Sequence, residues 1–204
     1  MAEFLDVYDA NRNLVGTADR VVVHAFGLWH KTIHCWIAWN GKIVFQRRSK
    51  SRDSNPGKLY TTASGHVLAG ETPEQAFARE VMQEIGVTPK NPKWLDEGVW
   101  VADVKKTDGS ILEDRVFWNW FLAEWDGKLE DFKFQDGEVD SVVAIDLDEF
   151  IKWSRKPAGE IDGIEWDGKN LAKAKLTRND FVQNEGETIH GKFGVVAEKI
   201  KEVI

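Results

Sequence analysis

The chain has 204 residues, which is long enough for one domain with a sizeable core or for a domain with an appendage. Its 34 acidic and 27 basic side chains give a net charge of -7, which argues against bulk nucleic acid and anionic membranes as partners. A phosphorylated small molecule remains compatible with this charge, because it needs only a few local cations or a metal ion. The single cysteine, Cys35, excludes an internal disulfide framework and a multi-cysteine zinc site, and we expect it to be a small buried residue. The first residues do not resemble a secretory signal and no apolar run approaches membrane-spanning length, so we expect a cytoplasmic protein.

The first predicted elements are two strand pairs. Residues 4–8 and 14–17 flank a polar turn, which predicts a small opening hairpin. Residues 33–39 and 42–47 are joined by Asn40-Gly41, a pair that tolerates positive φ and is typical of a tight hairpin turn. A polar, cationic loop then extends from residue 47 to residue 58.

One helix is predicted from its ends as well as its periodicity. Thr72 fits the N-cap, Pro73 the first turn, and Gln75 completes a capping box with Thr72. Gly86 then ends the helix. The apolar residues fall on one arc at helical spacing: Phe77, Ala78, Val81, Met82 and Ile85.

The second half of the chain mixes further strands with helices. The pattern predicts strands at 99–104, 116–123 and 141–145, and a short helix at 147–153. A polar, glycine-containing stretch at 157–168 is interpreted as a boundary. The end of the chain predicts an amphipathic helix, with Phe193, Val196, Ala197, Ile200 and Val203 on one side. Because there is no steady βαβ rhythm, we expect an α+β fold in which helices pack on a mixed sheet.

The polar face of the helix predicted between Thr72 and Gly86 carries the side chains best suited to metal binding. Glu80 and Glu84 are four residues apart, so one lies a turn above the other, with Gln83 beside them. Glu71 lies just before the helix, and Gly65 is six positions earlier. Stacked carboxylates can hold a hard divalent cation, which neutralises phosphate charge and lowers the pKa of bound water. The same spacing is also typical of a solvated helix face, so spacing alone leaves both interpretations open.

The full pattern is more specific than the spacing. Gly65, five residues, Glu71, seven residues and then the run from Arg79 to Val87 resembles the Nudix box, with Gln83 in place of one glutamate as the single departure. The resemblance implies an α/β/α sandwich around a mixed β-sheet, with an N-terminal hairpin and a C-terminal helical extension. We expect the Nudix domain to span residues 28–157, between an N-terminal β extension at 1–27 and a C-terminal extension at 158–204.

The resemblance also implies an activity: hydrolysis of a diphosphate bond in a nucleoside diphosphate derivative, with magnesium or manganese. Glu80 and Glu84 would be metal ligands, with Gln83 and Gly65 in the same metal site, and Arg79 and Glu71 would orient the ligands. Gly65 would let the backbone approach the metal or phosphate closely, because it has no Cβ. The cations of the loop could meet diphosphate oxygens or could be a solvated loop; these are Arg47, Arg48, Lys50, Arg52 and Lys58.

Gln83 raises an alternative. An amide oxygen can ligate a cation but has no charge, so the site loses one negative charge. Either another acid supplies that charge, or the chain is a weakened domain that acts as a nucleotide-binding or regulatory module. The candidate auxiliary acids are Glu113 and Glu138, with Asp114 and Asp140 beside them.

The segments around the box resemble the isopentenyl-diphosphate-isomerase-like branch of the Nudix proteins. The residues that support this branch are 23–34, Gln46-Arg47-Arg48-Ser49, Pro56-Gly57 and Ala63-Ser64-Gly65-His66. Isomerase activity is the less favoured function, because Ser64 and Arg115 stand where isomerases have a cysteine and a glutamate. A serine hydroxyl is a poor acid or base for a carbon skeleton, and arginine keeps its proton.

The histidines have two interpretations. In isomerases, His24, His30 and His66 would correspond to metal ligands, and with Glu113 they could bind zinc or manganese. We favour local hydrogen bonding for His24, His30 and His34, which would shape the entrance to the site. The terminal helix could cap its own core or pair with a second subunit, so a homodimer stays open.

Overall fold

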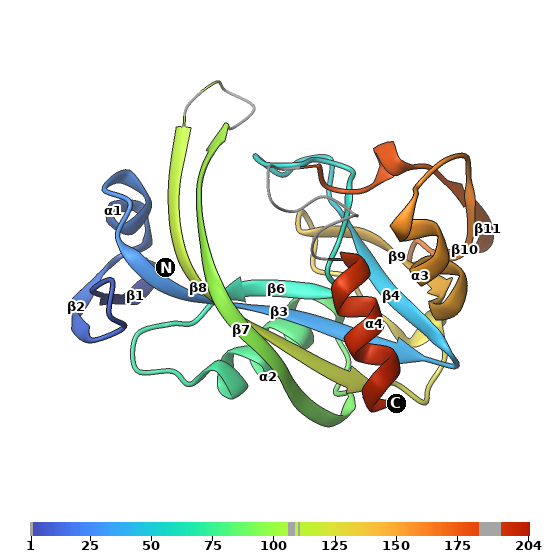
Figure 1. Cartoon of the computed structure of the whole chain (residues 1–204), viewed down its shortest axis with the longest axis horizontal. Coiled ribbons are helices and arrows are strands. Elements are labelled where there is room, and N and C mark those ends of the chain that lie inside the picture. Colours follow the sequence, from blue (N-terminus) through green and yellow to red (C-terminus); the bar gives the residue numbers. More distant parts are fainter. Residues whose placement is uncertain (1, 106–108, 110, 184–192) are drawn as a thin grey trace.

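The computed structural model of the chain describes residues 2–105, 109, 111–183 and 193–204, leaving aside the side chains of 102–105, 111 and 112. Its strands form one mixed sheet with helices on both faces (Figure 1). The strands are β1 (Phe4–Tyr8), β2 (Leu14–Asp19), β3 (Trp29–Trp39), β4 (Lys42–Arg48), β5 (Leu59–Tyr60), β6 (Ala63–His66), β7 (Lys90–Lys105), β8 (Ile111–Glu124), β9 (Val139–Asp146), β10 (Ile161–Trp166) and β11 (Leu171–Leu176). The helices are α1 (Arg20–Ala25), α2 (Pro73–Ile85), α3 (Leu147–Arg155) and α4 (Gly194–Val203), with short 3-10 turns η1 (Leu129–Asp131) and η2 (Arg178–Asp180). This architecture confirms the predicted α+β class and mixed sheet.

Strand β3 is the centre of the sheet. It runs parallel to β8 and antiparallel to β1, β4 and β6. Its second half pairs with β4 at residues 37–39, whereas residues 32–35 pair with β6. Strands β4 and β6 therefore pair with different parts of β3 and diverge from each other.

The two faces of the sheet bury two sets of side chains, because successive residues of a strand point to opposite faces. On β3, Ile33, Cys35 and Ile37 pack with the apolar face of α2. Trp36 on the other face packs with residues of α3 and α4. Cys35 is fully buried and free, as predicted.

The hairpin predictions are confirmed, and two strands are longer than predicted. Asn40 and Gly41 have φ values of 49° and 71°, as the tight turn between β3 and β4 requires. Strands β7 and β8 form a long antiparallel arm that arches away from the body (Figure 1). The sequence does not reveal the start of β7, because irregular pairing between Lys90 and Asp96 interrupts the alternation on which the prediction depends.

The C-terminal segments join the same sheet and core. The stretch 157–168 was expected to be a boundary, but β10 lies within it and pairs with β9 and β11. The sequence does not predict this strand, because it contains polar and glycine residues and its half-buried positions do not alternate clearly. Helix α4 buries Val196, Ala197 and Ile200 in the core of its own chain, together with Phe193 at its N-cap, while Val203 is exposed. The homodimer and the cytoplasmic location stay predictions; within the described residues, no helix has the length and apolarity to cross a membrane.

Candidate active site

Helix α2 presents the acidic residues, and its ends form as the sequence predicts. The Thr72 hydroxyl accepts a hydrogen bond from the Gln75 N–H, and the Gln75 side chain accepts one from the Thr72 N–H. Gly86 ends the helix at φ 68°, in the left-handed region. Phe77 and Val81 of α2 are buried against the sheet, while Glu80 lies on β6 and Glu84 contacts both β4 and β6.

Glu84 is held by contacts with these two strands. Its side chain is almost completely buried, and its Oε2 accepts two hydrogen bonds, from the Ser64 N–H of β6 (3.0 Å) and the Gln46 Nε2 of β4 (3.1 Å). Burial raises the pKa of Glu84 to about 8, and the charge of Glu80 adds to the shift. With Oε2 occupied by two donors, Oε1 is the oxygen left for a ligand.

The raised pKa predicts a fall in stability on the alkaline side. The folded protein keeps a proton on Glu84 that the unfolded chain has released, so this contribution is complete below pH 4.5 and is lost as the pH rises to about 8. Between pH 6.5 and 8, the metal-free protein should lose about 2 kcal/mol of unfolding free energy. Urea unfolding in a chelator, repeated with manganese, checks this: manganese should remove the loss, and a flat metal-free profile would contradict it.

The window starts at pH 6.5 because the buried histidines act in the opposite direction below it. Burial lowers the pKa of His30 from 6.5 to about 4, so the unfolded chain binds more protons in that range. Stability contributed by neutral His30 is therefore lost as the pH falls through 6.5, so the loss caused by Glu84 is clearest above this pH, where Glu80 with its raised pKa acts in the same direction.

Glu80 lies directly on Gly65. A Cβ added to Gly65 would be 2.0 Å from Oε1 of Glu80, so only glycine lets the carboxylate occupy this place. Burial raises the pKa of Glu80, while the adjacent Arg79 guanidinium opposes the shift. The observed close approach is that of the Glu80 side chain; the predicted approach of the backbone to a metal or phosphate stays a prediction.

Arg79 connects Glu71, Glu80 and the end of β6 through hydrogen bonds. Its Nε and Nη2 donate to the two carboxylate oxygens of Glu71, both at 2.9 Å, and its Nη1 donates to Glu80 (2.6 Å). Nη2 also donates to the carbonyl of His66, which anchors the end of β6. Despite some burial, the hydrogen bonds from Arg79 and the Leu68 N–H lower the pKa of Glu71. Arg79 thus contacts both Glu71 and Glu80, as the predicted orienting role requires.

The amide oxygen of Gln83 accepts a hydrogen bond from another side chain of the protein. Its Oε1 accepts a hydrogen bond from Arg79 Nη1 (3.2 Å), and the side chain is exposed at the rim of the cavity. Nη1 of Arg79 thus donates to both the Glu80 carboxylate and the neutral amide oxygen of Gln83. A glutamate here would add a second carboxylate to compete for that nitrogen.

The donor set fits one divalent metal ion. Glu71, Glu80 and Glu84 with Arg79 leave two negative charges, which one Mg²⁺ or Mn²⁺ would balance. Carboxylate oxygens are the ligands these hard cations prefer, and the cradle at Gly65 brings one of them to the cavity wall.

A cavity of about 890 Å³ extends from these acids across the sheet and under the loop 49–58. Glu80, Gln83 and Glu84 line one side of it. The lining also includes Arg48 and, from outside the predicted set, the aromatic residues Tyr60 and Trp118. The volume is that of a pocket for a small molecule.

Of the three predicted substrate-binding residues, the structure brings only Arg48 to the cavity. Arg48 is fixed by hydrogen bonds to the Ser54 carbonyl and hydroxyl. Arg47 instead forms an ion pair with Glu165 (2.7 Å), and the Lys58 ammonium donates to the carbonyl of Asn179. Neither lines the cavity.

Of the four candidate auxiliary acids, two line the cavity and two do not. Glu138 lines the cavity, where it pairs with Arg52, and Asp114 lines it farther along. Glu113 lies outside the lining and pairs with Arg115 (3.2 Å). Asp140 accepts the backbone N–H of Lys50.

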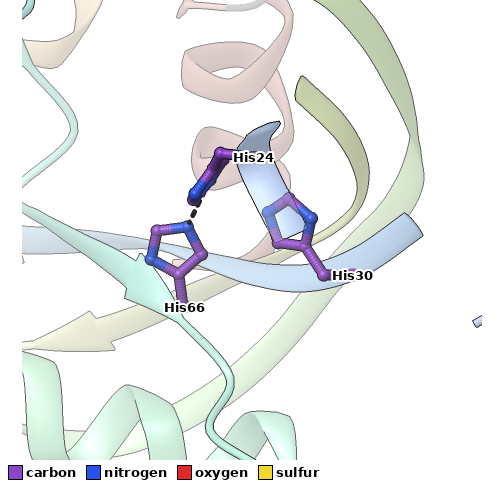
Figure 2. A group of neighbouring side chains, drawn as sticks. All are labelled: His24, His30 and His66. Carbon is purple, nitrogen blue, oxygen red and sulfur yellow. Dashed lines mark hydrogen bonds between the residues drawn. The ribbon is translucent and has the colours of Figure 1, made fainter. Parts of the chain in front are cut away.

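Three histidines from separate elements lie side by side, as Figure 2 shows, and two of them, His24 and His66, line the cavity. His24 comes from α1, His30 from β3 and His66 from β6, and their ligand atoms lie within 4.8 Å of one another. His24 and His66 share a hydrogen bond of 3.2 Å between their Nε2 atoms. Asp114 Oδ1 is 3.4 Å from His30 Nε2 and 3.9 Å from His24 Nε2.

The hydrogen-bond partners set the tautomers of two of these rings. Nδ1 of His24 meets the carbonyl of Arg20 (2.9 Å), and Nδ1 of His30 meets the carbonyl of Leu28 (3.0 Å). Each Nδ1 therefore has a proton, so in the neutral ring each Nε2 presents a lone pair. Burial also lowers the pKa of His66.

The predicted local hydrogen bonds of the histidines are present. His34 is the third example, since its Nδ1 pairs with the Tyr60 hydroxyl at 3.2 Å. The sequence analysis did not predict that Asp114, rather than Glu113, would stand beside His24 and His30. It also missed Gln46 as a partner of Glu84; the only signal was its position just before Arg47 and Arg48.

Comparisons with known proteins agree with this geometry. The family model of the NUDIX domain matches residues 28–166. An uncharacterised Nudix hydrolase of Clostridium acetobutylicum is 29% identical over 192 residues, which cover 88% of this chain and 90% of that protein. An isopentenyl-diphosphate Delta-isomerase of Corynebacterium diphtheriae is 40% identical over 75 residues, 36% of this chain and 41% of that protein.

A solved structure supports the fold. A crystal structure of a Deinococcus radiodurans protein superposes with a TM-score of 0.56 at 20% identity, covering 74% of this chain and 87% of that one. The match of the family model, the box on α2 and the mixed sheet lead to one conclusion. The chain belongs to the Nudix family, and it is similar both to hydrolases and to the isomerase branch of that family.

Proposed function

We propose that the chain hydrolyses a diphosphate bond in a nucleoside diphosphate derivative or a related small molecule, with Mg²⁺ or Mn²⁺ held by Glu80 and Glu84. The observation that supports this is the presence of both charges in the lining of one cavity. The carboxylates of Glu80 and Glu84 and the guanidinium groups of Arg48 and Arg52 all line it. This arrangement suits a cation-bound diphosphate.

The bound metal would neutralise phosphate charge and lower the pKa of an attacking water. The chain's own residues do the positioning. Glu80 and Glu84 hold the cation, Arg79 and Glu71 fix Glu80, and the arginines meet phosphate oxygens. Gln83 supports Arg79 and is not needed as a charged ligand in this scheme.

Glu138 is the acid best placed to accept the proton of the attacking water. It lines the cavity, and its charge is among the causes that raise the pKa of Glu84, so the two carboxylates are within electrostatic range. The water oxygen bonds to phosphorus and the bond from phosphorus to the bridging oxygen breaks. One water proton goes to Glu138, and the bridging oxygen leaves with the departing phosphate.

The test is a panel of nucleoside diphosphate derivatives with magnesium or manganese, scored by the phosphate-containing products released. Turnover that requires a divalent cation and is lost in Glu80→Gln supports the proposal. Binding of the same compounds without turnover would favour a nucleotide-binding or regulatory module instead.

The alternative of a weakened domain has its own prediction at Gln83. Since Gln83 already serves Arg79, Gln83→Glu should change kcat by less than about threefold. Initial rates of the two proteins under saturating manganese check this. A gain of a hundredfold or more would instead show that the amide impairs catalysis.

We also propose that the three-histidine group is a second cation site of the same cavity. In the part of the chain that the structure describes, His30 Nε2 is buried without a hydrogen-bond partner, with the Asp114 carboxylate 3.4 Å away. Backbone carbonyls fix the Nδ1 protons of His24 and His30, an arrangement typical of metal-binding histidines. Imidazole ligands favour Zn²⁺, Mn²⁺ or Co²⁺ over Mg²⁺.

This second site is testable without turnover. Co²⁺ added to the protein should give visible absorption bands of histidine-bound cobalt, and His24→Asn should weaken its affinity by about 10-fold or more. His34→Asn is the matched control, because His34 lines the same cavity outside the group. Equal losses in the two variants would exclude the proposed ligand set.

A further inference from the structure

Two of the three arginines in the described lining of the cavity are paired with carboxylates that line it as well. Arg20 forms an ion pair with Glu3 (2.8 Å), and Arg52 forms one with Glu138. The third, Arg48, is held by Ser54. An anionic substrate that enters the cavity therefore meets arginines that already have anionic partners.

The Arg52–Glu138 pair joins the cationic loop to the acidic helix. On the side of Arg52, the Ser49 N–H donates to the Glu138 carbonyl (2.9 Å) and the Ser51 hydroxyl to the Gly137 carbonyl (3.3 Å). On the side of Glu138, the Gln135 N–H donates to the carbonyl of Glu84 (3.2 Å). The backbone on both sides is thus fixed, and only the two side chains need to move for the pair to open.

We propose that Arg52 is an exchangeable counter-ion: a bound diphosphate draws its guanidinium away from Glu138, and this exchange releases the Glu138 carboxylate to face the attacking water. The inference rests on the proposed function, because it assigns to Glu138 the role of proton acceptor. It makes Arg52 a positioning residue that delivers the acceptor only when a substrate is present.

The exchange is physically favourable because the existing pair is weak and the new one is strong. The two side chains are 28% and 30% exposed, and a pair at such exposure contributes little net stability. A diphosphate offers several charged oxygens, and the guanidinium fork can bind two of them at once. The backbone of Glu138 stays in place when the Arg52 side chain moves, since its carbonyl accepts the Ser49 N–H and its own N–H donates to the Gln135 carbonyl.

Binding of methylenediphosphonate, a diphosphate analogue without a cleavable bridge, tests the exchange by calorimetry in a chelator. Glu138→Gln should bind it about five- to tenfold more tightly than the wild type, because Arg52 no longer has a charged competitor. Arg52→Gln should bind it more weakly. In the double variant, the gain from Glu138→Gln should shrink to about twofold or less.

Glu3→Gln is the matched control, since it removes a carboxylate that also lines the cavity and pairs with an arginine. Its effect on affinity should be the same with and without Arg52. A gain from Glu138→Gln that persists undiminished in the Arg52→Gln background would overturn the proposal, because it would reflect only reduced negative charge in the cavity.

Steady-state kinetics give the second readout. Arg52→Gln should raise KM and largely keep kcat, whereas Glu138→Gln should lower both. A purely structural role of the pair would move both variants in the same direction and would contradict the exchange. Because the analogue measures binding alone, the coupling can be found even if no hydrolysis is observed; in that case only the proposed function fails.

Discussion

Glu84→Gln should reduce hydrolysis on the order of a thousandfold, because it reverses the polarity of the group that faces the cavity. In the wild type, Ser64 and Gln46 both donate to Oε2 of Glu84. In the variant, the amide oxygen must serve these two donors, so the NH₂ group takes the position of Oε1. A donor then points at the cation site. Initial rates with manganese, together with manganese affinity by electron paramagnetic resonance, measure the effect.

The same substitution should stabilise the metal-free protein at pH 8. A neutral amide has no ionised form to desolvate, so the fall in stability expected for the wild type between pH 6.5 and 8 should disappear. Glu74→Gln is the control, because Glu74 is on the exposed first turn of the same helix. Wild-type rates in Glu84→Gln would remove the assigned ligand role, and an unchanged pH profile of its unfolding would show that Glu84 does not cause the alkaline fall in stability.

The parts of the site within one helix could be predicted from the sequence, because helical geometry fixes their relation. The cap at Thr72, the end at Gly86 and the stacking of Glu80 over Glu84 all follow from local spacing. The resemblance implied that Gly65 allows a close approach to the metal or phosphate, but its contact with the Glu80 side chain was not predicted and is seen only in the structure.

Contacts between distant segments could not be predicted in this way. Gln46 and Glu84 are 38 residues apart, and Arg52 and Glu138 are 86 residues apart. Their contacts depend on how β4 and β6 diverge from β3 and how two loops meet over the cavity. The histidine group has the same origin, since it needs α1, β3 and β6 to converge.

Arg47 and Arg48 are neighbours in the sequence, but only one of them lines the cavity. The sequence treats them as one cationic segment, but both belong to the end of β4. Successive strand residues point to opposite faces, so Arg48 enters the cavity while Arg47 meets Glu165 of β10. The face of each arginine depends on the end of the strand, and strand ends are poorly fixed by sequence.

Gly65→Ala should separate folding from function at the metal site. The new Cβ would lie 2.0 Å from Oε1 and 2.2 Å from Cδ of Glu80, so this carboxylate must leave its place. It is the far end of a flexible side chain, and it would lose its bond to Arg79 as it moves. A displaced ligand should reduce kcat/KM by about a hundredfold.

The fold should tolerate this change. Gly65 is in β6 without a positive φ, and alanine restricts the unfolded chain more than glycine does, so the unfolding free energy should change by less than about 1 kcal/mol. Gly16→Ala is the matched control, since its added Cβ would meet no atom within 4 Å. Thermal unfolding and manganese titration of both variants distinguish the two effects. If Gly65→Ala keeps wild-type manganese affinity and turnover, Glu80 does not hold the cation from the position it occupies against β6.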